Sequence, residues 1–138
     1  MTEQLDKDIS TEATAADGSQ YGKISINFNV IAMIARETAE KTPGVVQLQG
    51  SLTDDLAGML GKKAKDRGVR IERESDEHLS LELSVILKFG LCIPDVCVQL
   101  QKAVKSAVEE MTGQQVFAVN VVVRGVENPE KKAELIEG

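Results

Sequence analysis

The sequence is short of aromatic residues. Its 138 residues include no tryptophan, one tyrosine and three phenylalanines, so aromatic side chains make up only 3% of the chain. The hydrophobic content of 42% is therefore supplied mainly by aliphatic residues, and a chain of this length can bury one domain core with them. Few rings remain on which the bases of single-stranded nucleic acid could stack, which argues against that class of protein.

The sequence also lacks long apolar runs. None approaches the roughly 20 residues that a membrane-spanning helix needs. The first ten residues, MTEQLDKDIS, carry acids where a secretory signal has a basic start and an apolar stretch. Two cysteines without an export signal are typical of a reducing compartment. The sequence predicts a cytoplasmic protein with no transmembrane segment of its own, whose membrane contact would be peripheral or through a partner.

Charge is distributed unevenly. Of the net charge of −6, residues 1–20 contribute five acids against one lysine, and residues 127–138 contribute four acids against two lysines. Residues 21–126 balance thirteen basic and thirteen acidic side chains. This neutral region lacks the basic surface of a dedicated DNA or RNA binder. The local exception is a basic cluster formed by Lys62, Lys63, Lys65 and Arg67, with Arg70 nearby.

Residues suited to catalysis are scarce. The single histidine, His78, falls in an expected turn, where a solvated turn residue is a simpler interpretation than a catalytic base. Cys92 and Cys97 have four residues between them, whereas the redox motif has two, and the common zinc hooks are also more closely spaced. Neither familiar glycine-rich phosphate loop is present. We therefore predict no catalytic residues, no metal, no cofactor and a protein that is not an enzyme.

Hydrophobic periodicity predicts two main helices and several strands. One helix follows Asn27, a suitable cap, and ends at the Thr42-Pro43-Gly44 sequence. The other spans residues 94–111 and has Pro94 in its first turn. Residues 51–68 are expected to form a partly helical excursion, and residues 129–137 a weak terminal helix. Strands are expected at 23–26, 45–48, 69–73, 79–89 and 116–124, of which 79–89 alternates most clearly, with one face in the core and the other largely in water.

These elements predict an α+β fold, a two-layer sandwich in which a small mixed sheet has two main helices packed on one face. Residues 1–20 lack periodicity and are expected to be a disordered acidic tail. The folded domain is expected over residues 21–127, followed by a short charged tail over 128–138.

Several short strings, in order, resemble one protein family. They are YGKISI from Tyr21, PGV from Pro43, GVRI from Gly68, FGLCIPDV from Phe89 and VNVVVRGV from Val119. Together they are similar to the alkaline shock, or envelope stress response, proteins of Gram-positive bacteria, over about three quarters of the chain. The two cysteines depart from the family pattern, in which a polar and a small residue are usual.

The resemblance implies a small cytoplasmic α+β protein with no established enzymatic activity. It also implies a link to cell-envelope homeostasis and stress, with some members held at the membrane by a separate membrane-embedded partner. The family has no catalytic motif to carry over to this sequence.

The resulting hypothesis is a non-enzymatic interaction module that acts through protein partners near the cytoplasmic membrane face. Its candidate docking surface is the basic cluster Lys62, Lys63, Lys65, Arg67 and Arg70, which could contact an acidic protein or anionic lipid heads. Self-association through bordering strands is a further expectation. The alternative is a KH-like nucleic-acid-binding regulator, because Gly58-Met59-Leu60-Gly61 matches a G-x-x-G loop, although its apolar middle residues and the neutral central region argue against it.

Overall fold

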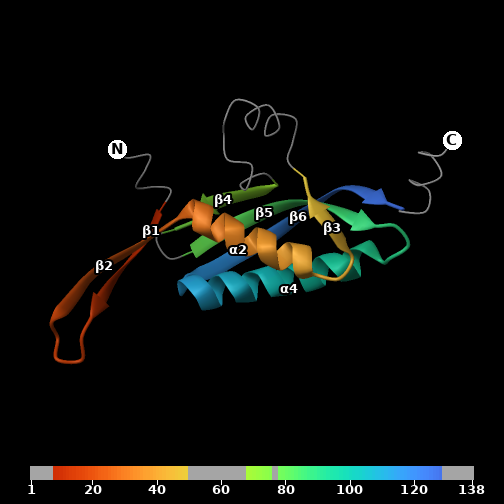
Figure 1. The fold of residues 1–138 in the computed structure, drawn as a ribbon. Coiled ribbons are helices and arrows are strands. Elements are labelled where there is room, and N and C mark those ends of the chain that lie inside the picture. The colour runs from red at the N-terminus through yellow and green to blue at the C-terminus, as the bar shows by residue number, and fades with distance from the viewer. Residues whose placement is uncertain (1–7, 50–67, 76–77, 129–138) are drawn as a thin grey trace.

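The computed structural model describes residues 8–49, 68–75 and 78–128. Both helices pack on one face of a sheet, which confirms the predicted two-layer α+β sandwich (Figure 1). In chain order the elements are β1 (Asp8–Thr14), β2 (Gln20–Asn27), α2 (Phe28–Lys41), β3 (Val45–Leu48), β4 (Val69–Arg73), β5 (His78–Lys88), α4 (Ile93–Thr112) and β6 (Gln115–Glu127). The expected excursion over 51–68 and the expected terminal helix over 129–137 lie mostly or wholly outside the described residues.

Strand β5 is the centre of the sheet. On one side, β6 runs parallel to it along its whole length, from the pair His78 and Gln115 to the pair Lys88 and Glu127. The other side is shared, since β4 pairs antiparallel with the first half of β5 and β3 pairs antiparallel with the second half. The combination of parallel and antiparallel pairs confirms the predicted mixed sheet.

The alternation in β5 directs one face into the core. Leu81, Leu83 and Val85 are essentially inaccessible to solvent beneath the helices. The expectation that the other face is largely in water is wrong for Ser80, Ser84 and Ile86, which are also buried. Because strands flank β5 on both sides, its outer side chains are shielded by neighbouring side chains of those strands.

The helices begin and end where local chemistry predicts. The Asn27 side chain accepts a hydrogen bond of 2.8 Å from the Asn29 N–H and so caps α2. Pro94 lies in the first turn of α4, where its missing N–H has no intrahelical partner. Gly113 ends α4 with a φ of 75°, a left-handed conformation that glycine adopts without steric penalty. The buried stripe of α4 is Val96, Leu100, Val104 and Val108.

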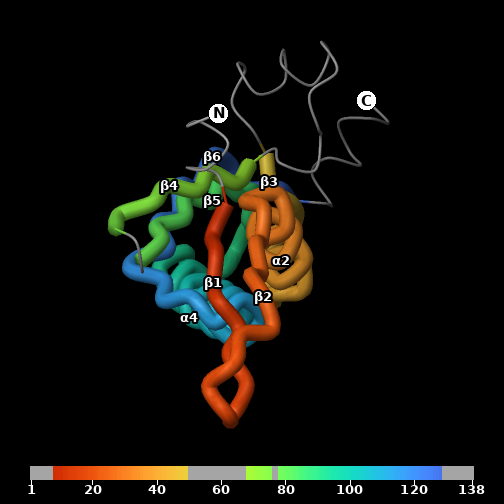
Figure 2. The backbone as a smooth tube through the Cα atoms, turned by 90° about the vertical axis from the view of Figure 1, so that its left-hand side faces the viewer, coloured from red at the N-terminus to blue at the C-terminus, as the bar shows by residue number. Residues whose placement is uncertain are grey.

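Strands β1 and β2 form an antiparallel ribbon, here called the arm (residues 8–27), which projects away from the two layers (Figures 1 and 2). The predicted disordered tail over 1–20 therefore needs correction, because β1 begins at Asp8. Ile9 is buried in the main core, and the Arg73 guanidinium donates to the Asp8 carbonyl while lying 5.9 Å from the centre of the Phe28 ring. These contacts join residues distant in sequence, so local composition did not indicate them.

Candidate interaction surfaces

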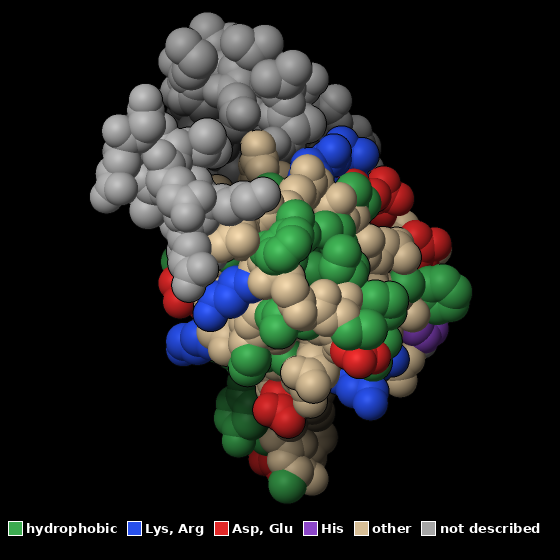
Figure 3. All heavy atoms as spheres, turned by 90° about the vertical axis from the view of Figure 1, so that its right-hand side faces the viewer, with side chains coloured by type: hydrophobic (Ala, Val, Ile, Leu, Met, Phe, Trp, Pro, Cys, Tyr) green, Lys and Arg blue, Asp and Glu red, His purple; other side chains and the backbone are tan. Residues whose placement is uncertain are grey.

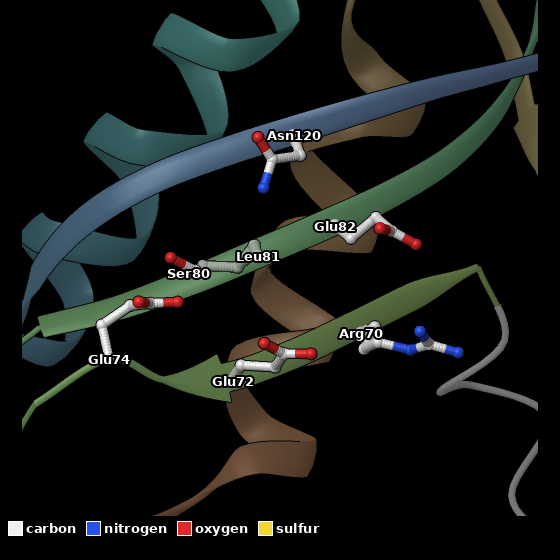
Figure 4. A pocket seen from close by; sticks show the side chains of 7 residues that line it. All are labelled: Arg70, Glu72, Glu74, Ser80, Leu81, Glu82 and Asn120. Carbon is white, nitrogen blue, oxygen red and sulfur yellow. The ribbon is translucent and has the colours of Figure 1, made fainter.

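Arg70 is the one member of the predicted docking surface that the structure describes. It lies in β4 on the sheet face opposite the helices, directly across from Glu82 of β5. It helps to line a polar hollow of about 70 Å³ (Figure 4). The other lining residues are Glu72, Glu74, Ser80, Leu81, Glu82 and Asn120. Carboxylates around Arg70 offset its charge, since opposite charges facing each other across two strands attract.

The arrangement in this hollow does not create a basic surface. The carboxylates of Glu72 and Glu74 point toward β5, whereas the Arg70 guanidinium extends toward the start of β4 (Figure 4). Lys62, Lys63, Lys65 and Arg67 lie outside the described residues, as does the G-x-x-G string over 58–61. The docking role of the basic cluster and the KH-like alternative both stay predictions.

A second surface lies at the end of the sheet where β5 turns into α4. Four large apolar side chains are exposed there, with exposed fractions of 63%, 47%, 40% and 44%. We call this surface the end patch, and it consists of Phe89, Leu91, Ile93 and Val126. Figure 3 looks onto this end of the molecule, and hydrophobic side chains gather near the centre of the face.

Backbone hydrogen bonds hold the end patch together. The Phe89 N–H donates to the Glu127 carbonyl at 2.9 Å, which places Phe89 beside the end of β6. The preceding N–H, that of Lys88, donates to the Gly44 carbonyl at 2.9 Å. Gly44 has a φ of 96°, and a Cβ added there would lie 3.0 Å from a methyl carbon of Leu91. Glycine at this turn therefore allows Leu91 to pack closely against the backbone.

A shallow groove between the two helices opens near this end. It has a volume of about 310 Å³. Its lining is Thr38, Lys41, Thr42, Pro43, Gln99 and Ala103. Because Pro43 precedes Gly44, which touches Leu91, the groove and the end patch adjoin one another.

The end patch was not recognised from the sequence, although a signal was present. Phe89 and Leu91 are large apolar residues in the segment that joins β5 to α4, and Ile93 begins the helix. Such connections are usually rich in polar residues, glycine and proline, so apolar side chains here indicate a surface that contacts something. In the sequence alone, the cysteines and Pro94 mark this string only as a helix start.

The two cysteines occupy separate environments and are not bonded to each other. Cys92 is exposed and precedes α4 as its cap residue, without a side-chain hydrogen bond to the helix. Cys97 is half-buried against the core, and this burial raises the pKa of its thiol above the ordinary value of 9.0. A thiol that keeps its proton is a poor nucleophile, so Cys97 behaves as a small apolar residue.

His78 closes the turn before β5. Its Nδ1 lies 2.9 Å from the Ser75 Oγ, and its carbonyl accepts a hydrogen bond of 3.0 Å from the Glu74 N–H. The ring is half-buried, so it is less solvated than the sequence indicated. These contacts account for the residue as part of a tight turn.

The described residues provide neither a metal-binding cluster nor a membrane-spanning helix. No group of three or more histidine, cysteine or acidic side chains within residues 8–49, 68–75 and 78–128 is arranged to hold a metal ion. Over the same ranges, no helix combines the length and the apolar character that crossing a bilayer requires.

Comparisons with known proteins point to one family. YloU of Bacillus subtilis is 33% identical over 110 residues, which cover 78% of this chain and 91% of YloU. YqhY of the same organism is 24% identical over 129 residues, covering 94% of this chain and 95% of YqhY. Neither of these names states an enzymatic activity.

Among solved structures, a similar fold is found in the C-terminal domain of MamM, in the copper form of a variant. It has 13% identity and a TM-score of 0.46, and covers 73% of this chain and 100% of that one. So distant a likeness carries no functional argument.

A sequence model of the alkaline shock protein 23 family, described as having a cell envelope-related function, matches residues 16–128. The chain therefore belongs to the alkaline shock protein 23 family, whose function is related to the cell envelope.

Proposed function

We propose that this protein is a non-enzymatic interaction module in envelope homeostasis and stress response, and that it binds a membrane-embedded or membrane-anchored protein at the cytoplasmic face. The observation that carries the proposal is the end patch. Exposed large apolar side chains that gather on one face are typical of protein–protein contact sites. The family's cell envelope-related function supports a partner at the envelope.

The end patch has the features of a binding site for a protein. It includes Phe89, which is 63% exposed, and aromatic residues that become fully buried on binding often account for much of the binding free energy. The patch is built on a short turn held by hydrogen bonds from Lys88 and Phe89, so little conformational entropy would be lost on binding. The adjoining groove between α2 and α4 could receive a further side chain or segment. The basic cluster over 62–70 remains part of the proposal as an additional charged contact.

The test is capture of membrane proteins from cells by crosslinking and mass spectrometry, with the wild-type protein compared with Phe89→Asp. Phe89 is 63% exposed, so the substitution should leave the fold intact while placing a charge in the contact. We expect capture of the specific partner to fall by about tenfold or more, as for other central apolar contacts.

Phe117→Asp is the matched control, because Phe117 is 67% exposed and lies near the other end of β6. The control should capture the partner as well as the wild type does. Equal capture by Phe89→Asp and the wild type would contradict the proposal. So would binding of the purified protein to protein-free anionic vesicles through Phe89, because the partner would then be lipid.

A further inference from the structure

We propose that two copies of this protein form a symmetric dimer by pairing their β6 strands antiparallel, with the two-fold axis at Val122. The sheet would then run continuously across both copies. This inference goes beyond the proposed partner binding and does not depend on it, since it uses a different surface and different residues.

The backbone N–H and carbonyl groups of β6 point alternately toward β5 and away from it. On β5, the Ser84 N–H donates to Gly68 and its carbonyl accepts from Gln49, so even-numbered residues there bond toward β3 and β4. The Phe89 N–H instead donates to Glu127 of β6. Odd-numbered β5 residues therefore bond to the β6 residues that flank their register partners. Because Leu83 is opposite Val121 and Val85 is opposite Val123, the backbone groups of these two valines point away from β5.

The outer edge of β6 is closed in its first half by side chains of α4. Glu109 accepts a hydrogen bond of 2.9 Å from the Val116 N–H. Gln101 donates one of 2.9 Å to the Val119 carbonyl. These contacts agree with the direction deduced above, and they block a new strand from pairing there.

The second half of this edge has no strand partner other than β5 among the described residues. Within the same part of the chain, no hydrogen bond to the outward groups of Val121 or Val123 is found. Both valines are half-buried and pack on the core with their side chains. Natural proteins usually protect such edges from pairing with other chains. Side chains of α4 cover the first half of the β6 edge and leave the second half uncovered, which indicates that a partner strand pairs with the second half.

A second copy fits this stretch because the stretch is self-complementary. With a two-fold axis at Val122, Val121 of each copy lies opposite Val123 of the other. Each of these pairs exchanges two hydrogen bonds, so all outward N–H and carbonyl groups of Val121 and Val123 are satisfied. Val122 then faces its own copy as a close, non-hydrogen-bonded pair, in which apolar β-branched side chains pack well.

The charged side chains of this stretch are compatible with the antiparallel pairing of two β6 strands. The only charged side chain in residues 120–124 is Arg124, and the two-fold places it opposite Asn120 rather than opposite another arginine. The two Arg124 side chains are four strand positions apart, about 13 Å, so their repulsion is weak. A two-fold contact of this kind uses the same edge on both copies and closes, so it yields a dimer rather than a fibre.

The test uses disulfide crosslinking of the full chain in a Cys92→Ser background, which removes the exposed native thiol. Val122→Cys should give a covalent dimer on mild oxidation, because the two Cα atoms would be about 4.5 Å apart. Asn120→Cys is the matched control, on the same sheet face and two positions away. Its two thiols would be about 13 Å apart and should not crosslink.

A second variant tests the hydrogen bonds without a crosslink. Val121→Pro removes an outward N–H but no bond to β5, and proline is tolerated at such an edge. Light scattering should show a dimer for the wild type and only monomer for Val121→Pro, with the same circular dichroism spectrum. A monomeric wild type, equal crosslinking at positions 120 and 122, or a dimer unaffected by a folded Val121→Pro would each overturn the proposal. These outcomes are independent of whether Phe89 captures a membrane partner.

Discussion

At the scale of single residues, the two thiols differ although they are close in sequence. Cys92 is exposed ahead of α4, and Cys97 is half-buried against the core one turn into the helix. Accessibility determines which one meets a reagent first, and thiolate content determines how fast it reacts. A maleimide should therefore modify Cys92 well before Cys97 at pH 7, as mass mapping of the modified protein would show.

Cys97→Ala should lower the free energy of unfolding by about 1 kcal/mol at pH 7 and leave function intact, because a small, half-buried side chain is lost from the core. Burial raises the pKa of this thiol in the folded state, so the unfolded state ionises at a lower pH than the folded state. The stabilisation from Cys97 is thus complete below the ordinary thiol pKa of 9.0 and declines as pH rises above it. Urea unfolding of both proteins at pH 7 and above pH 9.0 should show the difference shrinking. A constant difference would contradict this account of burial.

At the scale of elements, the arm has a base that belongs to the core and an exposed outer part. Ile9 in β1 is 2% exposed, whereas Ile24 in β2 is 52% exposed. A two-stranded ribbon alone is marginally stable in water, so its anchoring depends on contacts at the base such as that between Arg73 and Asp8.

Ile9→Ala should therefore lower the free energy of unfolding by about 2–4 kcal/mol, as for other aliphatic truncations in a core. Ile24→Ala is the control and should change it by less than about 0.5 kcal/mol. Urea unfolding followed by circular dichroism would measure both. Similar costs for the two substitutions would mean that the ribbon does not pack as described.

Some of these elements were predictable from the sequence and others were not. The β5 strand and α4 were predictable because periodicity, Pro94 and Gly113 are local signals. The strand β1 was not, because its order comes from Ile9 and Asp8 meeting residues far along the chain. For the end patch the sequence offered only part of the signal: Phe89 and Leu91 are apolar residues in a turn, but their neighbours Gly44 and Glu127 come from distant segments that the order of residues does not bring together.

At the scale of the whole molecule, every described element contributes to one core: β2 and β4 through partly buried side chains, and the other elements through buried ones. A single shared core favours a single cooperative unfolding transition. Unfolding curves in urea from circular dichroism and from reaction of the Cys97 thiol, in a Cys92→Ser background, should therefore coincide. An earlier transition reported by Cys97 would show that α4 separates first. Tyrosine fluorescence would be a poor probe, because Tyr21 is 78% exposed on the arm.

The position of β6 has a consequence for synthesis of the chain. β5 receives its parallel neighbour only after α4 has been made, because β6 follows both in sequence. A nascent chain that has emerged only as far as α4 has one whole side of its central strand without hydrogen-bond partners. Translation proceeds at about 5–20 residues per second, so this intermediate persists for at least a second or so. During that time the strand can pair with another chain, so a translational pause between α4 and β6 should promote aggregation.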